Sequence, residues 1–111
     1  MAWVYLMIAG VFEIAWAIGL KYTEGFSKPV ASVVTVVLMI ASFVFLSQAV
    51  RELPIGTAYA IWTGIGAVGT AILGMILFNE PRDTVRILCM LLIVAGIVGL
   101  KLTAGGEAHV G

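Results

Sequence analysis

Four long apolar stretches alternate with three short polar links along this chain. Charge is nearly absent from residues 3–20, 30–50, 55–78 and 87–104, whereas charged residues, glycine and proline gather between them. An apolar run of about 20 residues is long enough to cross the hydrocarbon core of a bilayer as a helix. The pattern therefore predicts four transmembrane helices over these ranges, within a single membrane domain that covers residues 1–104.

Helices are the expected element because lipid offers the backbone no hydrogen-bond partners. A membrane β-barrel would need strands in which polar and apolar residues alternate, and these runs do not alternate. We therefore predict an all-α integral membrane protein with four transmembrane helices per chain. Residues 105–111 are expected to form a short disordered tail.

Composition agrees with a lipid environment and narrows the possible functions. The chain is 62% hydrophobic and 11% charged, whereas soluble domains carry about 25% charge. Its formal net charge is zero, so it lacks the basic surface that nucleic-acid binding requires. A single cysteine without a Cys/His cluster predicts no metal site, and no cofactor motif or nucleophile–base pair suggests an enzyme.

The positive charges are divided unevenly between the two ends of the predicted bundle. One side carries four of them and the other two; these are Lys21, Lys28, Arg82 and Arg86 against Arg51 and Lys101. Lysine and arginine bias sets the orientation of a membrane protein, and here the bias is weak. A chain that inserts in both orientations could form an antiparallel, dual-topology homodimer.

Glu13 is the strongest functional signal, because it stands inside the first apolar run. A charge at the middle of a membrane costs from about 2.5 to more than 10 kcal/mol, and such residues usually face a cavity and bind ions or protons. We therefore expect Glu13 to bind protons and a cation in turn. The structural alternative is a permanently protonated side chain that is hydrogen-bonded to another helix.

Residues of three helices could surround this carboxylate. Gly10 and Trp16 lie three positions before and after Glu13 and so share its helical face. The third helix has a stripe at three- and four-residue spacing, made of Tyr59, Trp62, Thr63, Gly66 and Thr70. Ser42 is a hydroxyl in the middle of the second span, and it could instead bond to its own preceding turn. Trp62 could instead be an interfacial anchor.

Small residues suggest where helices bend or pack. Gly64 and Gly66 could form a hinge near the middle of the third span, although close packing of helices explains them equally well. Cys89 and Gly96 lie seven residues apart on the fourth span, and small side chains let helices approach closely in lipid. We expect this face to contact a second copy of the chain, with packing inside the chain as the alternative.

Three motifs resemble the small multidrug resistance family over nearly the whole chain. They are Gly10-x-x-Glu13-x-x-Trp16-Ala17, the run LPIGTAYAIWTGIG over residues 53–66, and Gly99-Leu100-Lys101. Trp16, the Trp62-Thr63-Gly64 sequence and Lys101 resemble the guanidinium-exporting branch. The drug-exporting branch typically has a small residue in place of Trp16.

The resemblance implies an antiparallel homodimer with one binding site between its subunits, alternating access, and exchange of protons for a cation. It implies that Glu13 is the shared proton and substrate site, lined by Gly10, Trp16, Ser42, Tyr59, Trp62 and Thr63. The predicted function is proton-coupled export of guanidinium or related small cations across a bacterial inner membrane. The alternatives are export of quaternary ammonium or hydrophobic drugs by the same fold, and a membrane scaffold subunit that transports nothing.

Overall fold

The computed structural model describes the backbone of residues 1–110 and the side chains of residues 1–103. In this part of the chain the regular structure is entirely helical: α1 (Ala2–Tyr22), α2 (Pro29–Ala49), α3 (Ile55–Leu77) and α4 (Thr84–Val110). The predicted all-α class is confirmed. The expected tail, residues 105–111, lies outside the residues whose side chains are described.

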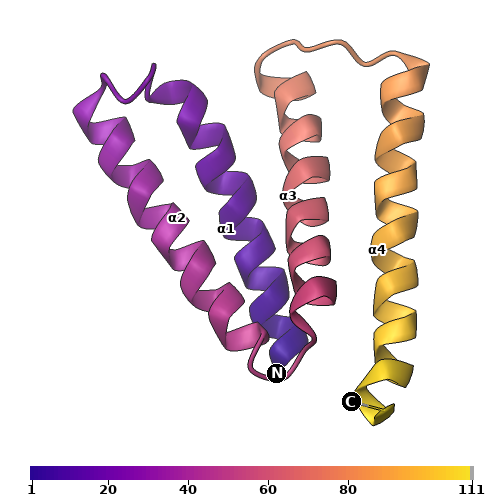
Figure 1. The fold of residues 1–111 in the computed structure, drawn as a ribbon. Coiled ribbons are helices and arrows are strands. Elements are labelled where there is room, and N and C mark those ends of the chain that lie inside the picture. Colours follow the sequence, from indigo (N-terminus) through magenta and orange to yellow (C-terminus); the bar gives the residue numbers. More distant parts are fainter. Residues whose placement is uncertain (111) are drawn as a thin grey trace.

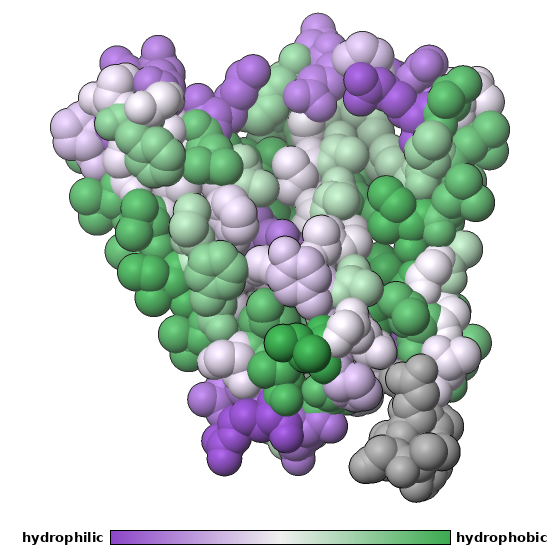
Figure 2. Space-filling model, viewed as in Figure 1, coloured by the Kyte–Doolittle hydropathy of each residue, from purple (hydrophilic) through white to green (hydrophobic). Residues whose placement is uncertain are grey.

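The four helices are suited to a membrane in both length and surface. Spans of 20 to 23 residues in each helix have mean hydropathies between 1.8 and 2.5. Hydrophobic side chains cover the flanks of the molecule, while hydrophilic residues gather at its two ends (Figure 2). This distribution places the flanks in lipid and the ends in water. The chain is thus a membrane protein that crosses the bilayer four times.

The fourth helix begins earlier than the apolar pattern suggests. The carbonyl of Asp83 accepts a hydrogen bond from the amide of Ile87 at 3.2 Å, and Arg86 pairs with Asp83 at 3.7 Å. Residues 84–86 therefore form an exposed first turn of α4. The charged residue Arg86 precedes the apolar span, but it lies inside the helix.

The helices form a thin slab. Helix α1 packs against α2 and α3, whereas α4 packs mainly against α3, as Figure 1 shows. The chain measures 47 × 34 × 17 Å along its principal axes. A helix with its side chains is about 10–12 Å across, so the slab is less than two helices thick. None of the residues from Thr84 to Thr103 is buried within the chain.

Packing is concentrated at one end of the slab. The buried apolar side chains come from the first half of α1, the end of α2 and the first half of α3; they are Leu6, Ala9, Ala49, Ala58, Ile61 and Trp62. We call this the closed end. At the opposite end, where α1 and α3 finish, the space between these two helices opens into a pocket.

Candidate functional site

Glu13 lies about midway along α1 and turns its carboxylate toward α3. The carboxylate rests against Gly66: a Cβ atom added to this glycine would collide with Oε1 of Glu13. Oε1 is buried, and it has no hydrogen-bond partner among the described residues. A buried, unpaired carboxyl oxygen is costly, so this atom requires a proton, a cation or water.

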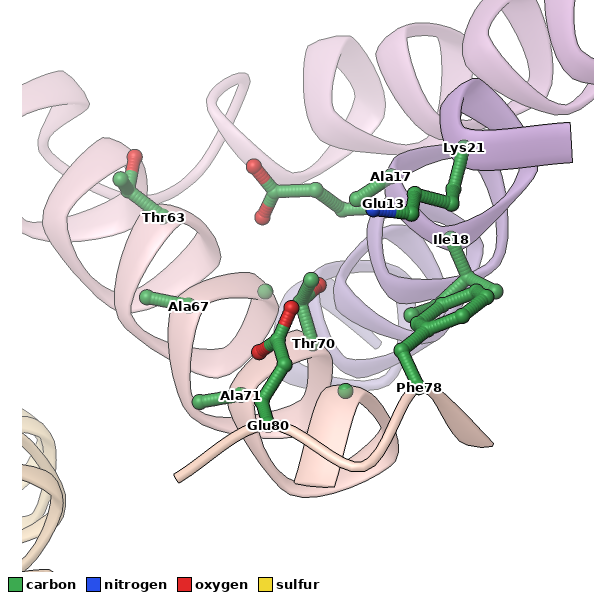
Figure 3. A pocket seen from close by; sticks show the side chains of 12 residues that line it. Glu13, Ala17, Ile18, Lys21, Thr63, Ala67, Thr70, Ala71, Phe78 and Glu80 are labelled. Atoms are coloured by element: carbon green, nitrogen blue, oxygen red, sulfur yellow. The ribbon is translucent and has the colours of Figure 1, made fainter. Parts of the chain in front are cut away.

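The pocket that contains Glu13 has a volume of about 490 Å³. This volume falls within the range typical of small-molecule sites, about 300–1,000 Å³. Besides Glu13 it is lined by Ala17, Ile18, Lys21, Thr63, Gly66, Ala67, Thr70, Ala71, Gly74, Phe78 and Glu80. Figure 3 shows these side chains around the open space between α1 and α3.

The pocket runs from the middle of the membrane to its surface. Lys21 follows Glu13 by eight residues on α1, a distance of about 12 Å along the helix axis. Lys21 and Glu80 stand at the end of the slab that contains the α3–α4 link. The pocket therefore connects an unpaired carboxyl group in the bilayer with water on one side.

Helix α3 supplies a wall of small and hydroxyl-bearing residues. Thr63, Gly66, Thr70 and Gly74 all line the pocket, and their spacing of three or four places them on one helical face. Oγ1 of Thr70 is buried and has no hydrogen-bond partner within the described structure. This wall thus offers a hydrogen-bonding group one turn beyond Gly66, on the outward side of Glu13.

Hydrogen bonds of Ser42 link three helices at the closed end. The indole Nε1 of Trp62 donates to Oγ of Ser42 at 2.9 Å, and Ser42 donates to the carbonyl of Ala9 at 2.7 Å. Ser42 therefore bonds to α1 and α3, not to the preceding turn of α2. Since both side chains are buried, the network fixes the three helices to one another.

A chain of aromatic rings continues from this network. Trp16 lies 6.4 Å from Phe43, Phe43 lies 5.5 Å from Trp62, and Trp62 lies 5.4 Å from Tyr59, measured between ring centroids. Nε1 of Trp16 is buried without a hydrogen-bond partner among the described groups. The rings thus bring together residues of α1, α2 and α3 that are far apart in sequence.

The structure divides the predicted site residues into two groups. Glu13, Thr63 and Gly66 line the pocket. Trp16, Ser42, Tyr59 and Trp62 belong to the aromatic and hydrogen-bonded cluster, and they do not line the pocket in this conformation. Their role in binding the substrate stays a prediction.

The remaining small residues differ in what they contact. Gly10, which was also predicted to line the site, packs against the side chain of Ile65 and does not line the pocket in this conformation. Gly64 packs against Ile97 of α4. In contrast, a Cβ added to Gly96 would meet nothing within 4 Å, and Cys89 is exposed. Gly64 and Gly66 therefore both lie in close contacts here, and a role for them in packing or in hinge motion stays a prediction.

Two residues of interest, Phe43 and Glu80, were missed by the sequence analysis. Thr70 was named in the predicted stripe on the third span, but nothing in the sequence marked its hydroxyl as unpaired. Phe43 is one apolar residue among many, and only packing places its ring between two tryptophans. Glu80 looks like an ordinary loop carboxylate, because its approach to the pocket depends on the local backbone.

No group of three His, Cys, Asp or Glu side chains that could hold a metal ion occurs among the residues described. The pocket instead combines a carboxylate, hydroxyl groups and small side chains. Such a site suits a small cation with N–H donors.

The sequence of this chain is similar to those of known proteins. Residues 1–93 match the family model described as Small Multidrug Resistance protein. A guanidinium exporter from Salmonella typhimurium is 56% identical over 104 residues, which is 94% of this chain and 99% of the relative. A guanidinium exporter from Yersinia pestis is 58% identical over 104 residues, which is 94% of this chain and all of the relative. The similarity therefore extends over nearly the whole chain.

Proposed function

Because this chain belongs to the small multidrug resistance family of membrane transporters, we propose that it exports guanidinium in exchange for protons. The family membership and the four membrane-spanning helices make it a multi-pass protein of the bacterial inner membrane. It is a transporter, not an enzyme.

One observation carries the proposal: a carboxyl group midway through the membrane has a buried, unpartnered oxygen and opens onto a pocket of about 490 Å³. A cation that leaves Glu13 would expose this group as an uncompensated charge unless a proton replaces it. Competition between a proton and the cation for one carboxylate is the simplest way to couple their movements.

Guanidinium fits the chemistry of this site. It is a planar cation whose parallel N–H groups match the two oxygens of a carboxylate, and it is weakly hydrated and stacks on aromatic rings. Glu13 supplies the carboxylate, and Trp16 is three residues away on the same helix. The similar exporters from Salmonella and Yersinia are named for this cation, which supports the same substrate here.

A second copy of the chain would complete the transporter. A slab 17 Å thick is too thin to surround a substrate and also shield it from lipid. Helix α4 packs mainly against α3, and none of its residues from Thr84 to Thr103 is buried, so it offers a surface for a partner. We infer an antiparallel homodimer, in which each slab has one closed and one open end and the pair brings two Glu13 side chains to one site.

Alternating access follows from this arrangement. If the two ends of the slab exchange their open and closed states, Glu13 faces opposite sides of the membrane in turn. Movement is restricted to the states in which two protons or one cation occupy the pair of carboxylates. The proposal is tested by measuring guanidinium uptake into proteoliposomes that have an acidic interior; protein-dependent accumulation is expected, and dissipating the proton gradient should abolish it.

Exchange of two protons for one guanidinium should move one net charge in each cycle. In proteoliposomes that take up guanidinium and release protons, we expect an inside-positive membrane potential to accelerate uptake. Each net charge moved is worth about 2.3 kcal/mol per 100 mV. Uptake at several potassium diffusion potentials measures this effect, and a rate independent of the potential would contradict the two-proton cycle.

Trp16 is expected to select small planar cations, because its bulky ring lies beside Glu13 on the same helix and packs near Phe43. The variant Trp16→Gly should admit quaternary ammonium ions and lower the kcat/KM for guanidinium about tenfold, the effect of roughly 1.4 kcal/mol. Competition between the two cations during uptake gives the measurement. Trp3→Gly is the matched control because it removes the other tryptophan of α1, and an unchanged substrate range in Trp16→Gly would refute the assignment.

A further inference from the structure

The link between α3 and α4 folds back over the end of α3. The amides of Phe78 and Glu80 both donate to the carbonyl of Gly74, at 3.0 and 3.3 Å. Between them Asn79 adopts a positive φ of 57°, a left-handed conformation that asparagine tolerates better than most residues. This turn directs the chain back toward α3 and brings the side chain of Glu80 to the pocket.

The Glu80 carboxylate is held close to α3 by the absence of a side chain at Gly74. A Cβ atom at this position would collide with Oε1 of Glu80, just as a Cβ at Gly66 would collide with Oε1 of Glu13. The two glycines are eight residues apart, about 12 Å along the helix. Helix α3 thus seats two carboxylates, one near the middle of the membrane and one near its surface.

Glu80 has no ion pair among the side chains that the structure describes, whereas two other loop carboxylates do. Asp83 pairs with Arg86 at 3.7 Å, and Glu24 pairs with Lys28 at 3.7 Å. The cation that lines the same pocket, Lys21, places its ammonium 5.4 Å from the centre of the Phe78 ring. The negative charge of Glu80 is therefore available to a ligand.

Thr70 stands between the two carboxylates. It lies four residues from Gly66 and four from Gly74, so it occupies the middle of the same helical face. Its Oγ1 is buried and lacks a hydrogen-bond partner in the part of the chain described. In Figure 3 the Glu80 carboxylate reaches toward Thr70, and the Glu13 carboxylate points into the same open space.

We propose that Glu80 is a second cation-binding residue of this transporter, which holds a small organic cation at the mouth of the pocket before it passes Thr70 to Glu13. The inference rests on the proposed function, because it adds an outer binding site, at Glu80, to the path that ends at Glu13. The mouth is open to water, so Glu80 acts mainly by raising the local concentration of the cation and its rate of entry. The inner carboxylate still determines coupling to protons.

The variant Glu80→Gln tests this role in guanidinium uptake by proteoliposomes. Removal of the outer charge should raise the KM for guanidinium about 3- to 10-fold at low ionic strength, with kcat within about twofold of the parent. The difference should shrink in high salt, because exposed charges are screened over about 3 Å at 1 M. Glu80→Asp keeps the charge and should restore most of the low KM.

Asp83→Asn is the matched control, since it removes the same charge from the same link but from a residue paired with Arg86. Its KM is expected to stay within about twofold of the parent. A second variant, Gly74→Ala, displaces the Glu80 carboxylate by steric contact and should raise the KM as Glu80→Gln does. Gly56→Ala, on the same helix with nothing within 4 Å of an added Cβ, controls for the added methyl group.

The outcomes separate this inference from the proposed function. An unchanged KM in Glu80→Gln, or an equal rise of the KM in Asp83→Asn, would refute the outer binding site at Glu80. The proposed transport through Glu13 would be unaffected by either result. A fall in kcat with an unchanged KM would indicate a structural role for Glu80 and would also refute the outer binding site. If the parent protein showed no proton-driven uptake at all, the proposed function itself would fail.

Discussion

Proteoliposomes that contain the Glu13→Gln variant are expected to show no proton-coupled guanidinium uptake. Glutamine has nearly the same shape as glutamate and can still fill the space against Gly66. It cannot release a proton, however, and it does not neutralise a cation. Hydrogen bonds to charged groups contribute roughly 1.5–3 kcal/mol, so binding of guanidinium should weaken about 100-fold, and coupling to protons should be lost altogether.

The same variant distinguishes a transporter from a membrane scaffold. A scaffold would keep its cellular activity when Glu13 is neutralised, whereas the proposed antiporter would not. Glu52→Gln is a matched control because Glu52 is a carboxylate that lines a different pocket, with Tyr5, Gln48 and Arg51. Size-exclusion profiles in detergent establish that each variant is folded; normal transport by folded Glu13→Gln would refute the proposal.

Alanine at Gly66 is expected to impair transport strongly without unfolding the protein. The added Cβ would meet Oε1, Cδ and Cγ of Glu13. These atoms belong to the end of a flexible side chain, so the backbone can stay in place while the carboxylate moves. Since catalytic and binding groups tolerate little displacement, we expect the kcat/KM for guanidinium to fall at least about tenfold.

The thermal stability of Gly66→Ala should not fall with its transport activity, so a loss of transport can be distinguished from unfolding. Alanine is favoured over glycine in a helix by about 1 kcal/mol, so the thermal stability of Gly66→Ala in detergent should equal or exceed that of the parent. Gly56→Ala adds the same methyl group to α3 but contacts nothing within 4 Å, and it should transport normally. Full activity in Gly66→Ala would show that the position of the Glu13 carboxylate is not restrained by α3.

Much of the fold could be predicted because it depends on local composition. Four predominantly apolar runs of sufficient length are expected to cross a membrane as helices, since lipid leaves the backbone no other partner. The residues at which the helices begin and end could not be predicted in the same way. Residues 84–86 begin α4 as an exposed turn, and hydropathy alone cannot separate such a turn from a loop.

The site was predicted only in part. Glu13 could be singled out because a carboxylate in hydrocarbon is rare and costly, and helical spacing placed Thr63 and Gly66 together on one face of α3. The partner of Ser42 could not be predicted, because Ala9 lies on another helix and offers only a backbone carbonyl. The role of Phe43 depends likewise on packing between α2 and its neighbours.

The sequence by itself determined that the chain resides in lipid, crosses it four times and carries one carboxyl group within the first span. These properties depend on the cost of transferring each residue from water, which is summed along the chain and needs no knowledge of its neighbours. The tertiary structure decided which glycine faces which carboxylate, that Ser42 and Trp62 close one end, and that Glu80 reaches the opposite opening. Contacts of this kind depend on the rotation of each helix about its axis and on the turn at Asn79, which are set by packing between segments distant in sequence.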